Sequence, residues 1–446
     1  MNERKGQWSS KLGFILSSAG AAIGLGAIWK LPYVTGENGG GAFFLLFVIF
    51  TLIIGLPMLI SEFIIGRGTQ KEAVSAYKKL APNSLWIWVG RLGVIGCFLL
   101  LSFYSVVGGW ITIYTGKAVI GSAISDHLDA AQLFSEVTSS PWLTILGLAV
   151  FSIINILVVS LGIQNGIEKA NKVMMPLLFI FFTILVIRAL TLPGAMAGVE
   201  FFLKPDFSAI TMKAVIYALG QAFFALAVGF SCMITYSSYL KKDVSLPNAA
   251  GSVVLMNIFV SLLAGLAIFP VVFSVGLQPA EGPGLLFIVL PTVFGHLPFG
   301  EVFFALFLLL FLFATLTSSF SLYEIIVAAL SEKWPGFRKT ITWIVGCIVI
   351  IAAIPAALSS SSLKDVKIAN RTFFDATDFL VSNIMLPAGN LLIAIFIMYK
   401  VDQALVKKEF LAASRLSEKW FTLWRVLMYT VVPIVIVIVL YFLAFK

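Results

Sequence analysis

The chain consists of long apolar runs separated by short stretches rich in charged residues, proline, glycine or asparagine. A hydrocarbon core about 30 Å thick is crossed by a helix of roughly 20 apolar residues. Runs of about that length cover 12–35, 41–66, 87–121, 142–160, 166–190, 214–239, 249–275, 302–330, 340–358, 376–399 and 422–444. The pattern predicts an all-α integral membrane protein with eleven transmembrane helices.

Composition supports a membrane protein, and the distribution of charge predicts how the chain is oriented in the membrane. Of the 446 residues, 60% are hydrophobic and 11% are charged, a balance outside that of soluble domains. The first run continues past Gly20 to Trp29 and Pro32, so it does not read as a cleavable signal peptide. Lysine and arginine gather in alternate loops, for example at Lys78 and Lys241, and such loops are cytoplasmic. We therefore expect a multi-pass protein of the cytoplasmic membrane, with its N-terminus inside, its C-terminus outside, and no nucleic-acid partner.

No linker or low-complexity tract divides the sequence, which indicates a single transmembrane domain over residues 1–446. Within it we expect one repeat at about 12–190, a second at about 214–399, and an extra helix at about 422–444.

The first and sixth apolar runs are interrupted in the middle by small residues. The interruptions are Gly20, Gly24 and Gly26 in the first run, and Gly229-Phe230-Ser231 in the sixth. They lie five runs apart, so the second set of five is inverted relative to the first, as in transporters with broken helices. Unwound backbone at membrane depth is tolerated only where it is buried in protein or lines a cavity. Close helix packing through small residues remains an alternative explanation for these glycines.

Several short motifs together resemble the neurotransmitter:sodium symporter family, and within it the bacterial transporters of several hydrophobic amino acids. They are Trp8, Gly20–Gly26, Trp29–Pro32, Glu37–Phe43, Glu62, Gly66-Arg67, Gln221–Ser231, Ile234–Tyr239 and Thr317–Ser319. The resemblance implies a LeuT-like 5+5 inverted repeat in which helices 1 and 6 are broken. It also implies sodium-coupled symport of neutral, hydrophobic L-amino acids, bulky aliphatic or aromatic, into the cell by alternating access.

The resemblance implies one or two sodium ions. The second sodium site of the family maps onto Gly20, Ile23, Ala314, Thr317 and Ser318. Its carbonyl and hydroxyl oxygens suit a hard cation, although hydroxyls of this kind can also bond back to their own helix.

The first sodium site of the family is less complete in this chain. Ala22 and Asn257 match, but Ala27 and Ala225 replace the asparagine and threonine of the family. Ser231 is a candidate replacement ligand, and the alternative is that backbone carbonyls and the carboxylate of the solute complete the site. One ion or two therefore remains open.

Chloride linkage is also left open. Gln221, Asn257 and Ser261 occupy positions at which chloride-dependent relatives place ligands, but Phe47 and Ala225 lack the hydroxyls expected beside them. Chloride and proton linkage stay as alternatives.

The resemblance also implies a substrate site. We expect the carboxylate of the solute at the N–H groups of Leu25 and Gly26 and at the hydroxyl of Tyr104. Relatives that carry monoamines have an aspartate where Gly24 stands, so an amino acid is the expected solute. The full expected set is Ala22, Leu25, Gly26, Leu100, Tyr104, Phe224, Ala225, Ala227, Phe230, Ser318 and Leu322.

Gates are expected on both sides of that site. The outer gate is an ion pair of Lys30 with Asp378, above Tyr104 and Phe230, and the inner gate is a pair of Lys5 with Glu332, supported by Trp8 and Tyr239. Exposed ion pairs contribute only about 0–1 kcal/mol, which suits parts that open in every cycle. Solvated loop charges are the alternative interpretation.

A glycine and a proline in the fifth run indicate a further feature, independently of the resemblance to the family. Gly166 and Pro176 bracket the cytoplasmic start of the fifth run. Glycine lowers the cost of unwinding and proline removes a helical hydrogen bond. We expect a hinge that opens a water path for sodium, the alternative being an ordinary proline kink.

Other function classes fit less well. A channel requires rings of polar or charged residues, and Glu62 and Glu324 are the only clear acids placed well inside the runs. An enzyme requires converging catalytic groups, and neither paired carboxylates nor a Cys/His couple converges on the runs. The three cysteines have neither metal nor disulfide spacing. A sensor that binds without transporting stays open, as does the oligomeric state.

Overall fold

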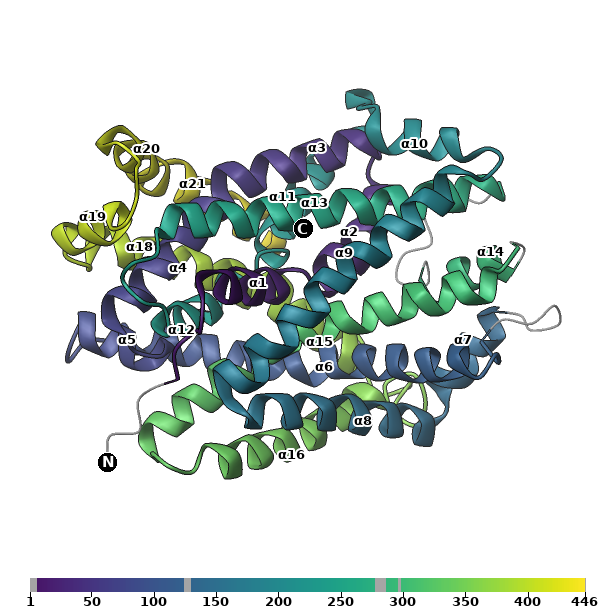
Figure 1. Cartoon of the computed structure of the whole chain (residues 1–446), viewed down its shortest axis with the longest axis horizontal. Coiled ribbons are helices and arrows are strands. Elements are labelled where there is room, and N and C mark those ends of the chain that lie inside the picture. The colour runs from purple at the N-terminus through teal and green to yellow at the C-terminus, as the bar shows by residue number, and fades with distance from the viewer. Residues whose placement is uncertain (1–5, 124–129, 277–285, 296–297, 446) are drawn as a thin grey trace.

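The structure is a computed structural model that describes residues 6–123, 130–276, 286–295 and 298–445. The elements of the first half are α1 (Lys11–Ala22), η1 (Gly26–Lys30), α2 (Leu31–Glu37), α3 (Gly41–Phe50), η2 (Thr51–Gly55), α4 (Leu56–Thr69), α5 (Ala73–Leu80), α6 (Ile87–Val119), α7 (Ala130–Ser139), α8 (Pro141–Ser160), η3 (Ile163–Glu168), α9 (Lys169–Leu190), α10 (Ala195–Leu203) and η4 (Phe207–Ala209). Those of the second half are α11 (Met212–Phe224), α12 (Cys232–Ser238), α13 (Leu246–Ser274), α14 (Val289–Gly295), α15 (Gly300–Lys333), α16 (Arg338–Ala357), α17 (Phe373–Asp378), η6 (Phe379–Met385), α18 (Leu386–Tyr399), α19 (Gln403–Leu411), α20 (Glu418–Tyr429) and α21 (Val431–Phe445). Figure 1 shows them as one bundle of helices.

Most of the predicted spans are long apolar helices. Among the described residues, nine helices are long and apolar enough to cross a membrane, and the bent pair Lys11–Ala22 and Gly26–Glu37 makes ten. The sixth predicted run is split into α11 and the short α12, and neither reaches the length of a span by itself. Helix length therefore does not confirm the predicted number of eleven.

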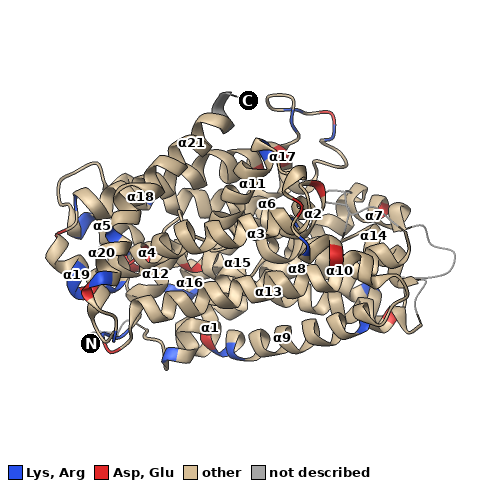
Figure 2. Cartoon of the chain, turned by 90° about the horizontal axis from the view of Figure 1, so that it is seen from above, with Lys and Arg blue, Asp and Glu red and all other residues tan. Residues whose placement is uncertain are grey.

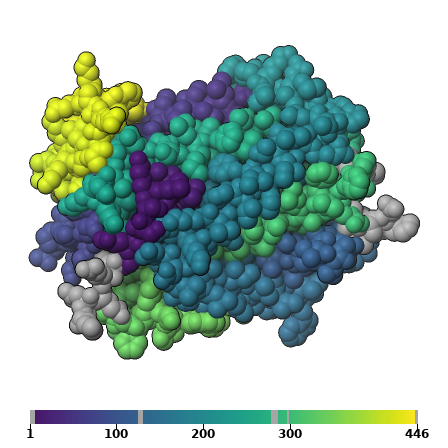
Figure 3. Space-filling model, in the orientation of Figure 1, coloured from purple at the N-terminus to yellow at the C-terminus, as the bar shows by residue number. Residues whose placement is uncertain are grey.

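The two ends of the bundle carry most of its charge. Lys, Arg, Asp and Glu gather at the end formed by α5 and α19 and at the end formed by α10 and α17, with few between them (Figure 2). The first described residues lie at the surface near α5 and α19 (Figure 3). A bundle with charged ends and an apolar middle is what a multi-pass membrane protein requires.

The first span lies inside the bundle. Every residue of α1 from Gly13 to Ala22 is buried, and the helix packs against α9, α13 and α15. A helix that is apolar on all sides is expected in the interior of a large bundle. Its break consequently opens into protein rather than into lipid.

Both predicted breaks are present. The axis of the first span bends by 51° between Ala22 and Gly26, and the sixth span is non-helical from residue 225 to residue 231. Ala227, Gly229 and Ser231 have positive φ angles of 51°, 103° and 62°. Such angles are uncommon outside glycine and are typical of functional segments held by their surroundings.

Candidate functional site

A small cavity of about 30 Å³ lies where the two breaks meet. Its lining includes ten of the eleven residues predicted for a substrate: Ala22, Leu25, Gly26, Leu100, Tyr104, Phe224, Ala227, Phe230, Ser318 and Leu322. Ala225, the eleventh, does not line the cavity. Its backbone carbonyl is linked to that of Ala22, because the Asn257 amide donates hydrogen bonds to both. The predicted set is therefore brought together almost completely by four separate parts of the chain.

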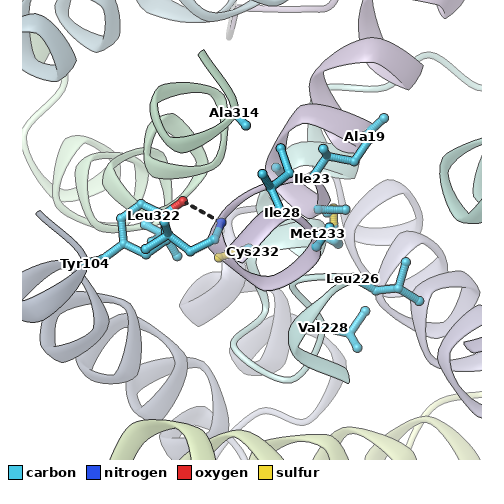
Figure 4. Close-up of a cluster of buried hydrophobic side chains, with 14 of the residues drawn as sticks. Ala19, Ile23, Ile28, Tyr104, Leu226, Val228, Cys232, Met233, Ala314 and Leu322 are labelled. Carbon is cyan, nitrogen blue, oxygen red and sulfur yellow. Dashed lines mark hydrogen bonds between the residues drawn. The ribbon is translucent and has the colours of Figure 1, made fainter. Parts of the chain in front are cut away.

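The polar end of the cavity is formed by a backbone amide and a phenol. The Leu25 N–H donates to Tyr104 Oη, with N···O 3.4 Å, and the same hydroxyl donates to the Thr315 carbonyl at 3.3 Å. Figure 4 shows Tyr104 and Leu322 pointing toward the break of the first span, with Cys232 beside them. Apart from Ser318, the residues that complete the wall have apolar side chains or are glycines. This arrangement suits a solute with one anionic group and an apolar body.

The break in the sixth span is held by a buried carboxylate. Glu62 on α4 is fully buried and accepts backbone hydrogen bonds from Gly229 at 2.7 Å, Met233 at 3.1 Å and Ile234 at 3.3 Å. These N–H groups have no helical partner, because Gly229 lies in the break and Met233 and Ile234 lie in the first turn of α12. Glu62 thus fixes the unwound segment that forms one wall of the cavity.

Oxygen atoms from α1 and α15 meet next to the cavity. The Ser318 hydroxyl reaches across to the Ala21 carbonyl, 3.0 Å away, whereas the Thr317 hydroxyl donates to Ala314 within its own helix, also at 3.0 Å. The alternative of back-bonding therefore describes Thr317 but not Ser318. Gly20 packs against Thr317, since a Cβ built on Gly20 would lie 3.0 Å from Thr317 Cβ.

The last residue of this predicted sodium set, Ile23, follows α1 directly. Its N–H donates to the Ala19 carbonyl at 2.7 Å, and its ψ of 81° is no longer helical. The Ile23 carbonyl is consequently released from the helical pattern, as a carbonyl that binds a cation must be.

The residues predicted for a first sodium site are arranged differently. Asn257 donates its amide N–H to the Ala225 carbonyl at 2.7 Å and to the Ala22 carbonyl at 3.5 Å. The buried side chain of Ala27 adds no oxygen. Ser231 has its contacts elsewhere, because its hydroxyl lies 3.2 Å from the hydroxyl of Tyr77 on α5. The carbonyls that would face an ion here already accept hydrogen bonds from an amide.

The outer pair lies on the side of α2 and α17. Lys30 Nζ is 3.9 Å from Asp378 Oδ1, and both side chains are partly exposed. The same ammonium lies 5.0 Å from the centre of the Phe224 ring. A cation over an aromatic face is attracted by the ring quadrupole, so Lys30 bridges α17 and the rim of the cavity.

The inner set is described only in part, so the predicted pair of Lys5 with Glu332 stays a prediction. Lys5 lies outside the described residues, and Glu332 pairs with Lys71. The indole N–H of Trp8 donates to the Tyr236 carbonyl at 2.8 Å, and the Trp8 backbone N–H donates to the Tyr239 carbonyl at 3.3 Å.

A buried ionic network continues from Tyr239. The Tyr239 hydroxyl donates to Glu324 Oε1 at 2.8 Å, and the Arg338 guanidinium binds both oxygens of the same carboxylate. Sequence reasoning found Glu324 only as an isolated acid, because its partner Arg338 is on the next helix.

The predicted hinge has a helical conformation here. Gly166 lies in η3, a short π-helical segment, and Pro176 lies inside α9. Glu168 of η3 accepts hydrogen bonds from the backbone and the hydroxyl of Ser9, at 2.7 and 2.5 Å. The start of the chain is therefore tied to this segment.

Comparison with known proteins places the chain in a family. The profile of the Sodium:neurotransmitter symporter family matches residues 5–125 and 127–446. The chain belongs to this family. It is therefore a sodium-dependent transporter rather than an enzyme, and a multi-pass membrane protein.

Relatives of this symporter are similar over nearly their whole length. The sodium-dependent transporter YhdH of Bacillus subtilis is 51% identical over 443 residues, which is 98% of each chain. A sodium-dependent transporter of Haemophilus influenzae is 39% identical over 451 residues, again 98% of each chain. The crystal structure of MhsT in complex with L-phenylalanine is 39% identical, with a TM-score of 0.91 over 99% of this chain and 100% of that one. The LeuT-like fold with broken helices 1 and 6 is thereby confirmed.

Some residues around the symporter cavity were missed by sequence reasoning. Cys232 and Leu386 both line it, and the thiol of Cys232 lies 3.3 Å from that of Cys97. Cys232 directly follows the Gly229–Ser231 interruption, which was the available signal. Nothing local indicated Leu386, since α18 is distant in sequence from the two breaks.

Proposed function

We propose that this chain is a sodium-coupled symporter of neutral, hydrophobic L-amino acids, bulky aliphatic or aromatic, that carries them into the cell by alternating access. The observation that carries the proposal is the cavity between the two breaks, in which the Leu25 N–H and the Tyr104 hydroxyl form a polar end and apolar residues form the wall. The complex of MhsT with L-phenylalanine supports the same class of solute.

The carboxylate of the solute binds at the N–H groups of Leu25 and Gly26 and at Tyr104. Backbone N–H groups that a break releases from the helical pattern favour an anion. Gly24 lies beside Ser318 and Tyr104, and it supplies no acid to pair with an amine that lacks a carboxylate. The side chain of the solute lies between Leu100, Phe230 and the other apolar lining residues.

Sodium binds at the second site, between α1 and α15. The oxygens available there are the carbonyls of Gly20, Ile23 and Ala314 and the hydroxyls of Thr317 and Ser318, which suit a hard cation. The first site offers fewer oxygens than the second, because Ala27 and Ala225 lack side-chain oxygens and the Asn257 N–H groups donate to the carbonyls. Asn257 Oδ1, which is buried and unpaired among the described residues, is the one side-chain oxygen left there. We therefore propose one sodium ion for each solute, and we assign no role to chloride.

The gates and the orientation belong to the same proposal. Lys30 and Asp378 close the outer side, and Trp8, Tyr239 and Glu332 belong to the inner side. The N-terminus is cytoplasmic, because the end formed by α5 and α19 is rich in Lys and Arg. Unwinding between Gly166 and Pro176 opens the inner side.

The test is uptake of labelled phenylalanine, tryptophan or leucine into proteoliposomes under an inward sodium gradient. We expect saturable uptake that collapses when potassium replaces sodium. Equal uptake in the two salts would overturn the sodium coupling, and saturable uptake of an amine without a carboxylate would overturn the assignment of the solute. Thr317→Ala combined with Ser318→Ala is expected to abolish the sodium dependence of phenylalanine binding.

A further inference from the structure

The side chain of Asn171 on α9 is half satisfied in a fully buried position. Its amide N–H donates to the Ile167 carbonyl one turn earlier, with N···O 2.8 Å. Its Oδ1 accepts no hydrogen bond from the described residues, and the side chain has no exposed surface. A buried polar atom without a partner is unfavourable.

The unpaired oxygen lies against Gly20, on the side of α1 that packs on Thr317. A Cβ built on Gly20 would overlap Asn171 Oδ1, and the same position is 3.0 Å from Thr317 Cβ and 3.3 Å from Met175 Sδ. Gly20 and Thr317 are both proposed sodium ligands. Of the two α9 atoms at this position, the amide oxygen is a hard ligand and the thioether is a soft one, and only the oxygen suits sodium.

The position of Asn171 also indicates from which side of the membrane it approaches the second sodium site. In a helix the Cβ tilts toward the helix N-terminus, so Asn171 approaches Gly20 from the side of the N-terminus of α1. That side faces the end formed by α5 and α19 (Figures 1 and 2), which is the proposed cytoplasmic end. Asn171 is also midway between Gly166 and Pro176, in the segment proposed to unwind.

We propose that Asn171 Oδ1 is a further ligand of the sodium ion at the second site, on its cytoplasmic side. The proposal rests on the proposed function. Because this oxygen belongs to α9, unwinding between Gly166 and Pro176 withdraws it, and the ion loses a ligand at the moment when water gains access. Asn171 thereby links release of sodium to opening of the inner side.

The test has two measurements. In the first, the purified protein is titrated with sodium in the absence of solute, and the rise of its thermal midpoint is recorded. In the second, the sodium dependence of phenylalanine binding is measured. Asn171→Leu is expected to raise the sodium concentration for half-maximal effect about tenfold, the scale of one hydrogen-bond-like contact to a charge. Asn171→Asp keeps the oxygen but loses the donor to Ile167. It is expected to stay within about threefold of the wild type.

Asn155→Leu is the matched control. Asn155 is also buried and donates to the carbonyl one turn earlier, at 2.9 Å from Phe151, but its Oδ1 already accepts a hydrogen bond from Ser319. Its removal should leave the sodium titration unchanged.

The outcomes separate this inference from the proposed function. An unchanged sodium titration in Asn171→Leu would overturn the role of Asn171 as a ligand and leave the proposed symport intact. An equal loss of sodium affinity in the Leu and Asp variants would show that Asn171 only stabilises α9. A wild-type protein that is not stabilised by sodium would refute the second sodium site itself.

Discussion

The carboxylate of Glu62 on α4 accepts a hydrogen bond from the backbone N–H of Gly229, with Oε1···N 2.7 Å. Met233 and Ile234 donate to its other oxygen. One side chain therefore replaces the helical partners that the break in the sixth span removes. Glu62 lies 167 residues before Gly229 in the sequence.

Loss of this carboxylate should destabilise the protein. Glu62→Leu leaves three buried N–H groups without an acceptor, each costing about 1–3 kcal/mol, so we expect a loss of at least about 3 kcal/mol. Glu62→Gln keeps one acceptor oxygen and should lose less. Unfolding of the purified protein in detergent measures both variants, with the exposed Glu200→Gln as control. A Glu62→Leu variant as stable as the wild type would show that the break in the sixth span does not depend on Glu62 for its stability.

Gly24 leaves no room for a side chain. A Cβ there would lie 2.6 Å from both Cβ and Oγ of Ser318 and 2.7 Å from Tyr104 Oη, closer than side chains pack. Gly24→Ala should therefore reduce phenylalanine affinity by about tenfold or more, the scale of a 1.4 kcal/mol perturbation. Gly116→Ala is the control, because a Cβ at Gly116 meets nothing within 4 Å. Equal affinity in both variants, measured by binding of labelled phenylalanine, would refute the tight approach of α1 to Ser318.

The outer pair should affect rates more than stability. Lys30 and Asp378 are partly exposed at 3.9 Å, and such pairs contribute about 0–1 kcal/mol. We expect Asp378→Asn to leave the thermal midpoint nearly unchanged but to speed dissociation of bound phenylalanine to the outside. The charge swap Lys30→Asp with Asp378→Lys should slow dissociation again. If neither variant alters the dissociation rate, this pair is not a gate.

The Arg338 and Glu324 pair should behave in the opposite way. Glu324 is fully buried and is bound by the two terminal nitrogens of one guanidinium. Removing one partner of a buried pair costs about 3–5 kcal/mol, because the other charge is left unpaired. Arg338→Leu should therefore be strongly destabilising, and Arg338→Leu combined with Glu324→Leu should recover much of the loss. Additive losses in denaturant unfolding would contradict the pairing.

Local pattern was enough for the membrane-spanning helices in general and for the two breaks. Apolar runs the length of a bilayer, and their interruption at Gly20–Gly26 and Gly229–Ser231, predict spans and breaks, because the helix period and the cost of unsatisfied backbone act over a few residues. The motif residues also indicated the family, and ten of the eleven predicted cavity residues do line the cavity. The sixth span was the exception in length, because its break leaves only the 13 residues of α11 and the seven of α12 helical.

Only the tertiary structure decided several contacts between side chains of distant helices. It paired Glu332 with Lys71 and Glu324 with Arg338, brought Leu386 and Cys232 to the cavity, and turned the Asn257 amide toward two carbonyls. It also set the bare oxygen of Asn171 against Gly20. The sequence by itself determined the spans and breaks, because hydrophobicity and helix formation are local. These contacts depend on how helices far apart in the chain pack, and no local pattern carries that information.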